Sequence, residues 1–143
     1  MEHAKKFGAP ESILYNYGHW SLLLKPTQHT LGAMVVINND STKINFSSLL
    51  SDESDQLRGV FSDIETKLKI FLGYDKINYL FLMMEDEFLH AHIIPRYQSE
   101  RTFNGEVFKD FCWPYPYDLR QSNAVRRETF EKLSGTLSDL LRK

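Results

Sequence analysis

The spacing of apolar residues predicts four strands in the first two thirds of the chain. Residues 20–24 form a short apolar run, and residues 33–37 form a second run that is rich in β-branched side chains. Turn-forming residues connect the two runs, so we expect an antiparallel pair. Residues 77–84 and 89–94 predict two further strands, and the acidic residues 85–87 between them are expected to form a tight turn.

Two other segments show helical spacing. In residues 51–72, apolar side chains recur every three or four positions and would form one buried stripe. Ser51 can cap the amino end of this helix, and Gly73 can close its carboxyl end. A second helix, capped by Ser122, is expected at residues 123–141. The stripe of the first helix consists of Leu57, Val60, Phe61, Ile64, Leu68 and Phe71.

The remaining segments have no regular pattern. The first dozen residues are polar and are expected to be irregular. Residues 95–121 carry many aromatic side chains and no regular pattern, and for the aromatic residues at 103–117 packing or subunit contact is favoured over a role as a substrate lid. Together these elements predict an α+β fold, with an antiparallel sheet and two main helices in a single domain that spans residues 1–143.

One strand carries the candidate chemistry. Phe88, His90, His92 and Ile94 alternate with apolar residues, and residues two apart in a strand project from the same face. The two imidazoles would be roughly 6.6 Å apart along the strand. Pro95 lacks an N–H group, so it is expected to stop the strand or to confine it to a sheet edge.

Two histidines in this arrangement can act on a phosphate. A neutral imidazole is a competent nucleophile, and a pKa near 6.5 keeps much of the ring unprotonated at pH 7. His90, nearer the middle of the strand, is the candidate nucleophile, and His92 would donate a hydrogen bond to a phosphate oxygen. An incidental pair is one alternative. A metal site formed by His90, His92 and Glu87 is another.

Composition restricts the class of protein. The net charge of −2 does not suit a protein that coats nucleic acid. No apolar run is long enough to span a bilayer. The lone Cys112 cannot form an internal disulfide, so a cytoplasmic location is expected and this thiol has no assigned role.

Residues 89–96, with the sequence Leu-His-Ala-His-Ile-Ile-Pro-Arg, resemble the signature of the histidine-triad (HIT) superfamily. Gly32 at the start of a strand, the long helix, and Asn78 near the start of the next strand agree with this resemblance. The Phe103-x-Gly105 and Trp113-Pro114 segments are similar to a bacterial branch related to diadenosine polyphosphate hydrolases.

The resemblance implies a HIT-like fold with about five strands, a homodimer, and a nucleotide bound on the sheet. It implies transfer of a nucleotidyl group to the middle histidine, which matches His90, with His92 as the last histidine of the triad. No obligatory cofactor or metal is implied, although a divalent cation such as Mg²⁺ can accompany a polyphosphate substrate. No nucleic-acid or membrane partner is expected.

Three positions depart from the family pattern. Phe88 occupies the first position of the triad and offers only apolar packing. Lys25 falls near the position of a residue that grips the ribose, and a lysine cannot accept hydrogen bonds. Met83 or Met84 falls where a polar residue often lies near the phosphates. These departures leave the nucleotide specificity open.

Four residues besides the histidines are candidates for substrate binding: Phe88, Arg96, Lys25 and Asn78. For each, a structural role is also considered: core packing for Phe88, a solvated salt bridge for Arg96, and strand geometry for Asn78. Lys25, His19 and His29 are expected at the surface.

The resulting hypothesis is a hydrolase or nucleotidyl transferase that cleaves a phosphoanhydride or phosphoramidate of a nucleoside monophosphate. It would act through a covalent nucleotidyl-His90 intermediate. The alternative is a nucleotide-binding or sensing protein with little or no turnover.

Overall fold

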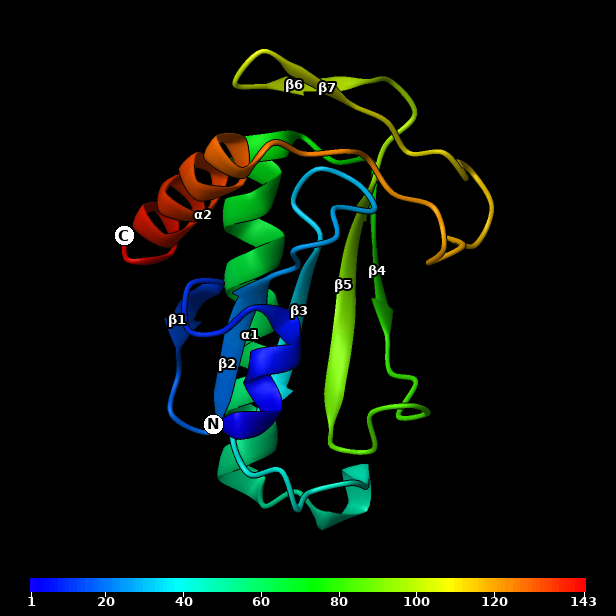
Figure 1. Ribbon diagram of the computed structural model, residues 1–143. Coiled ribbons are helices and arrows are strands. Elements are labelled where there is room, and N and C mark those ends of the chain that lie inside the picture. The colour runs from blue at the N-terminus through cyan, green and yellow to red at the C-terminus, as the bar shows by residue number, and fades with distance from the viewer.

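A five-stranded antiparallel sheet lies at the centre of the computed structural model, which describes residues 1–143 (Figure 1). The strands follow the order β1-β2-β3-β5-β4 across the sheet. The predicted α+β class and the antiparallel sheet are confirmed. The apolar pattern did not predict β1, because this strand has too few residues to show a period. The strand bounds are Ile13–Asn16 for β1, Trp20–Leu24 for β2, Met34–Asn38 for β3, Lys76–Leu80 for β4 and His90–Arg96 for β5.

Two α-helices lie on one side of the sheet (Figure 1). Helix α1 (Ser51–Leu72) has the predicted bounds, and Gly73 ends it with a φ of 61°, a left-handed conformation that favours glycine. The cap at its amino end is Leu50, not Ser51 as expected. The carboxylate of Glu53 accepts a hydrogen bond from the Leu50 N–H at 3.1 Å, which satisfies a free donor at the helix start.

Helix α2 (Arg127–Leu141) packs against β1 and α1. It begins four residues later than predicted. The side chain of Asn123 explains the difference, because its Nδ2 donates to the carbonyl oxygens of His29 and Lys109 at 3.0 and 2.9 Å. These bonds hold residue 123 in an isolated bridge with Gln28 and so keep it out of the helix.

The two faces of the sheet carry separate cores. The face toward α1 and α2 carries the larger cluster, which includes Leu22, Val36 and Ile93. The opposite face carries Leu23 and Val35 in a smaller cluster with Ala4, Phe7, Ile37 and Phe88. This second face is covered by the 3-10 helix η1 (Glu2–Phe7), whereas the sequence predicted irregular structure there. Short 3-10 helices have too few turns to show a period in sequence.

Strand β5 continues through Pro95, so the prediction that this proline stops the strand or lies at an edge is wrong. Pairing with β3 ends at Ile93, whereas pairing with β4 continues to Arg96. Pro95 is therefore paired with β4 but not with β3. Strand β4 ends at Leu80, and residues 81–89 form a longer connection than the expected tight turn at 85–87.

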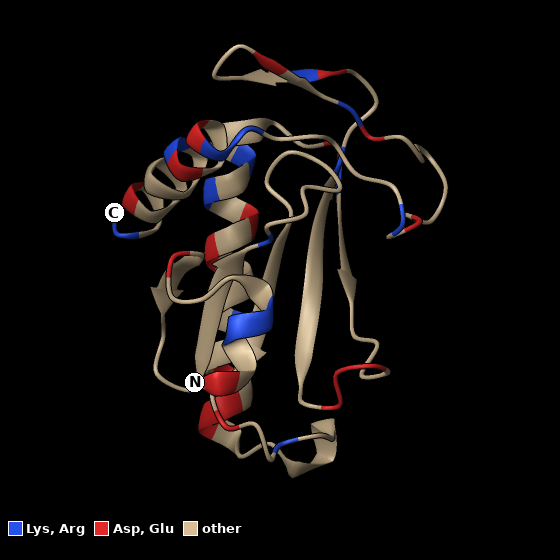
Figure 2. Ribbon diagram, in the orientation of Figure 1, with Lys and Arg blue, Asp and Glu red and all other residues tan.

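The aromatic segment after β5 contains a hairpin of β6 (Arg101–Phe103) and β7 (Glu106–Phe108). Tyr97, Phe108 and Tyr117 of this region are buried, so packing accounts for them as expected. A second 3-10 helix, η2 (Phe46–Ser48), precedes α1. Charged residues lie mainly on helices and loops, and the central strands are almost free of them (Figure 2). None of the helices is both long enough and apolar enough to cross a membrane.

A candidate active site on the histidine strand

Strand β5 presents His90 and His92 on the same face of the sheet. In the register with β3, His90 pairs with Ile37 and His92 pairs with Val35, and both partners belong to the smaller core. The two imidazole centroids are 5.3 Å apart, with ring planes at 83°. The two rings are therefore neighbours, close enough to contact one phosphate group.

The His90 ring is oriented by the main chain just before β5. Its Nδ1 atom lies 2.7 Å from the carbonyl oxygen of Phe88. A carbonyl oxygen only accepts, so Nδ1 carries the proton and Nε2 keeps a free lone pair. Burial lowers the pKa of His90, and the Phe88 carbonyl only partly opposes that effect. His90 is consequently a neutral imidazole at pH 7 with a nucleophilic Nε2.

The His92 ring contacts Lys25. Nδ1 of His92 lies 2.8 Å from Nζ of Lys25, and Nζ lies at the same distance from Nε2 of His29. Burial and the Lys25 cation lower the pKa of His92 to about 3. Burial lowers the pKa of Lys25 to about 8.

Lys25 and His29 are both buried, with 7% and 3% of their surfaces exposed, so the expected surface positions are wrong. The loop between β2 and β3 folds back on itself. The Gln28 side chain donates to the carbonyl oxygens of Lys25 and Ala33. Tyr117 donates to the His29 carbonyl oxygen and brings the aromatic segment over this loop. No local pattern marks His29, because Gln121 and Tyr117, which contact it from the aromatic segment, are far away in the sequence.

Helix η1 covers the histidines. The Phe7 ring lies 5.8 Å from the His90 ring and 6.3 Å from the His92 ring, measured between centroids. Phe88 packs against both Phe7 and His90. Lys6 forms an ion pair with Asp86 that joins η1 to the loop before β5. As a result, only 2% of the His90 surface is exposed.

Arg96 and Asn78 lie together, further along the sheet. The Arg96 guanidinium is 4% exposed and pairs with the fully buried carboxylate of Asp110 at 2.6 Å. It also donates to Asn78 Oδ1 at 2.9 Å and to the Tyr115 carbonyl oxygen at 2.7 Å. Arg96 is thus neither in a solvated salt bridge nor free toward the histidines.

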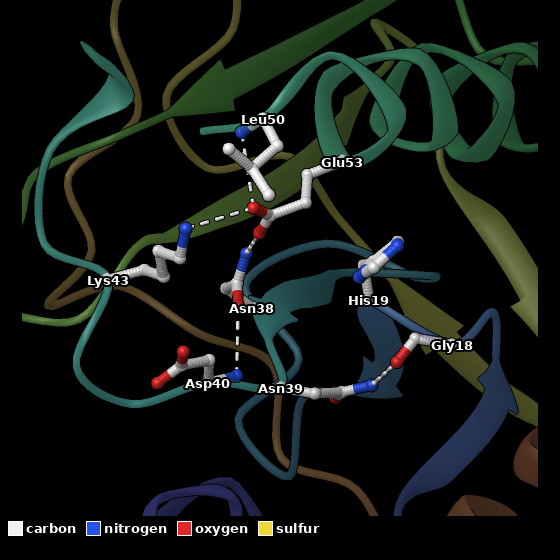
Figure 3. A pocket seen from close by; sticks show the side chains of 8 residues that line it. All are labelled: Gly18, His19, Asn38, Asn39, Asp40, Lys43, Leu50 and Glu53. Carbon is white, nitrogen blue, oxygen red and sulfur yellow. Dashed lines mark hydrogen bonds and ion pairs between the residues drawn. The ribbon is translucent and has the colours of Figure 1, made fainter. Parts of the chain in front are cut away.

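A polar hollow of about 460 Å³ lies near the amino end of α1 (Figure 3). Two of its charged groups, Glu53 and Lys43, are paired with one another: Glu53 accepts from Lys43 at 3.0 Å, and it also accepts from the Asn38 amide at 3.2 Å. Asn38 and Val36 share a parity on β3, so this hollow belongs to the helix-covered face and not to the histidine face. No sequence-predicted site residue lines it.

The structure gives no support to the metal alternative with Glu87. No group of three or more His, Cys, Asp or Glu side chains is placed to hold a metal ion. The histidine pair with Lys25 and His29 is therefore the cluster to which chemistry can be assigned.

Known structures share this fold. A histidine triad protein from Sinorhizobium meliloti is 18% identical, with a TM-score of 0.74 over 97% of this chain and 93% of its own. A histidine triad protein from Marinobacter aquaeolei is 23% identical, with a TM-score of 0.73 over 96% and 93%. A HIT-family member from Bacillus subtilis is 18% identical, with a TM-score of 0.59 over 97% and 94%.

These likenesses define the class: the chain has the fold of the histidine triad proteins. No protein-family model and no curated protein matches its sequence.

Proposed function

We propose that this protein is a histidine triad hydrolase or nucleotidyl transferase that acts on nucleoside phosphoanhydrides or phosphoramidates. The observation that carries the proposal is the contact between His90 Nδ1 and the Phe88 carbonyl oxygen, which leaves Nε2 as a free nucleophile. His92, whose ring lies 5.3 Å from the His90 ring, is the proposed hydrogen-bond donor. The shared fold supports membership of the same superfamily.

The reaction would proceed in two transfers. Nε2 of His90 attacks the phosphorus of the nucleoside monophosphate group, and a P–N bond forms while the bond to the leaving group breaks. The leaving group departs with the bonding electron pair and takes up a proton from solvent. Water or another acceptor then attacks the same phosphorus: a P–O bond forms, the P–N bond breaks, the attacking group loses its proton to solvent, and His90 is released as a neutral imidazole. His92 donates to a nonbridging oxygen whose charge grows in each transfer.

Substrate can reach His90 only after η1 moves. The apolar contact of η1 with this face is dominated by Phe7, and burial of one such side chain is worth about 1.5–3 kcal/mol. Nucleotide binding at micromolar affinity corresponds to about 8 kcal/mol, so binding energy can displace the segment. We infer that η1 opens when substrate binds.

Within this class, dinucleoside polyphosphates are the first substrates to examine. The Trp113-Pro114 and Phe103-x-Gly105 segments support this choice. Mg²⁺ would enter as part of such a polyphosphate substrate. Phe88 cannot hydrogen-bond through its side chain, so it would contribute packing beside His90.

The test is a chromatographic screen of dinucleoside polyphosphates, nucleoside phosphoramidates and nucleotide sugars. Wild-type protein should release a nucleoside monophosphate, and His90→Ala should abolish that release. His19→Gln, which alters a half-exposed histidine outside the proposed site, serves as the control. An acid-labile nucleotidyl adduct on His90 should appear by mass spectrometry after a rapid quench. Equal hydrolysis by wild type and His90→Ala would refute the mechanism.

A nucleotide-binding protein with little turnover is the second candidate. The closure of η1 over His90 favours it, since a covered nucleophile turns over slowly. Calorimetry would support this function if nucleotides bind while no substrate in the screen is cleaved.

A homodimer is the proposed assembly. Strand β4 is an edge of the sheet, with unpaired main-chain groups on its outer side. Near it, the Phe46 ring lies 4.8 Å from the Phe81 ring, and Leu82 and Met84 are exposed. Sedimentation equilibrium would test the dimer, and a monomeric mass at micromolar concentration would contradict it.

A further inference from the structure

A chain of hydrogen bonds leads from the main chain at Gln121 to the His92 ring. Nδ1 of His29 lies 2.9 Å from the carbonyl oxygen of Gln121. Nε2 of His29 lies 2.8 Å from Nζ of Lys25, and Nζ lies 2.8 Å from Nδ1 of His92. The loop after β2, the segment before α2 and strand β5 therefore meet at one buried ammonium group.

The direction of each hydrogen bond in this series follows from the group at its Gln121 end. The Gln121 carbonyl oxygen only accepts, so Nδ1 of His29 carries the proton of that neutral ring, and its Nε2 must accept. An ammonium group only donates, so Lys25 donates to His29 and also to Nδ1 of His92. The remaining ring nitrogen of His92, Nε2, must then carry the proton. Burial keeps both imidazoles neutral, because it lowers the pKa of His29 and of His92.

We propose that Lys25 and His29 are positioning residues that hold His92 in the tautomer with its proton on Nε2. This proposal rests on the proposed function, in which His92 donates to a phosphate oxygen. The donor is set before the substrate arrives, so the ring does not have to reorganise as charge develops. Lys25 acts through His92 and takes no place in a ribose contact.

The surroundings of Lys25 fit this role. No carboxylate is paired with Nζ of Lys25, so the two imidazoles are its hydrogen-bond acceptors. A third N–H remains on the ammonium group. His29 accepts a hydrogen bond from a second N–H of this ammonium group. Without His29 that buried N–H would have no partner, and an unpaired buried donor costs about 1–3 kcal/mol.

The first measurement reads the tautomer directly in the free protein. Long-range proton–nitrogen NMR spectra of nitrogen-15-labelled protein distinguish Nδ1–H from Nε2–H, and His92→Gln assigns the signal. The wild type should show His92 protonated on Nε2. Protonation on Nδ1 would overturn the proposal, and this result needs no substitution at Lys25 and no enzymatic activity.

The second measurement follows the pH titration of the His92 ring in Lys25→Met. Removal of the neighbouring cation should move the titration to higher pH than in wild type. The other titratable groups that face this ring, His90 and His29, stay in place, and Lys6 on η1 lies nearer His90. Lys109→Met removes an exposed lysine and should leave the titration unchanged. An identical titration in Lys25→Met would overturn the proposal.

Kinetics then separate positioning from substrate contact. In Lys25→Met, kcat should fall by up to about 100-fold, the scale of loss for a misplaced catalytic group, while KM stays within about threefold. His29→Gln should show the same pattern more weakly, with His19→Gln as its control. A raised KM with unchanged kcat would identify Lys25 as a substrate ligand and overturn the proposal. Retained activity in His90→Ala would instead refute the proposed function. The tautomer of His92 would still be decided by the NMR measurement, which does not depend on activity.

Discussion

The substitution Asp110→Asn tests whether Arg96 holds the fold together or serves the substrate. The side chain of Asp110 is fully buried and that of Arg96 is 4% exposed, and the closest atoms of the pair are 2.6 Å apart. Each carboxylate oxygen accepts two hydrogen bonds. Oδ2 accepts from Arg96 Nε and the Tyr97 N–H, and Oδ1 accepts from Arg96 Nη2 and the Cys112 N–H.

An asparagine cannot satisfy this arrangement in either orientation. Whichever oxygen becomes the NH₂ group would face two donors, and the Arg96 cation would remain buried without a counter-charge. Loss of one partner of a buried ion pair costs about 3–5 kcal/mol, which is a large part of the 5–15 kcal/mol typical of a whole domain. We expect the free energy of unfolding to fall by that amount.

Urea denaturation followed by circular dichroism measures this loss, provided that the slope with denaturant is unchanged. Glu131→Gln provides the matched control, because it breaks an exposed pair with Arg127 and should cost no more than about 0.5 kcal/mol. A loss below 1 kcal/mol for Asp110→Asn would refute the structural role of Arg96. Its guanidinium would then be available for a phosphate.

Three further predictions concern helix η1 above the histidines, the dependence of stability on pH, and two glycines. Phe7→Ala should raise kcat/KM about tenfold or more by lowering the cost of opening η1, and an unchanged or lower value in a folded variant would contradict the gating role. Unfolded protein binds protons at His92 near pH 6.5 whereas the folded ring does so at about pH 3, so stability should fall as the pH is lowered from 6.5 toward 3. Urea midpoints at pH 7 and pH 5 measure this change, and His92→Gln should reduce it. Gly59→Ala adds a methyl group in open space within α1 and should stabilise the protein by about 0.5–1 kcal/mol. Gly32→Ala, at a φ of 90°, should destabilise the protein by about 1–2 kcal/mol. Thermal melts that reverse the order of the two variants would contradict both predictions.

The sequence was sufficient for the elements with a strong period. Helix α1 was predictable because its apolar stripe is long and Gly73 closes it, and β5 was predictable because its residues alternate. The β6–β7 hairpin went unpredicted although Asn104-Gly105 is a strong signal for a tight turn. The structure places both residues at positive φ, as that turn requires. Its strands are too short to reveal alternation, so the turn residues were the only usable signal.

The site itself could be predicted only where it is local. The parity of His90 and His92 follows from the alternation in β5, and the Phe88 carbonyl oxygen that His90 contacts lies only two residues away in the sequence. Lys25 meets His92 across 67 residues of sequence, and His29 meets Gln121 across 92. Such contacts depend on how the loops close over the sheet, and residue spacing carries no information about them.

The electrostatics of the site follow from burial around a single cation. Three imidazoles, those of His29, His90 and His92, are held neutral because burial lowers each pKa. Lys25 keeps its charge at pH 7, since its pKa of about 8 still lies above that value. It does so without a carboxylate partner, and a buried charge without a counter-charge is costly. Its charge acts on His92 across the 2.8 Å contact and helps to keep that ring neutral, while burial leaves His90 with the free lone pair that the proposed attack requires. Burial around one cation therefore keeps both rings of the proposed site neutral, one as the hydrogen-bond donor and one as the nucleophile.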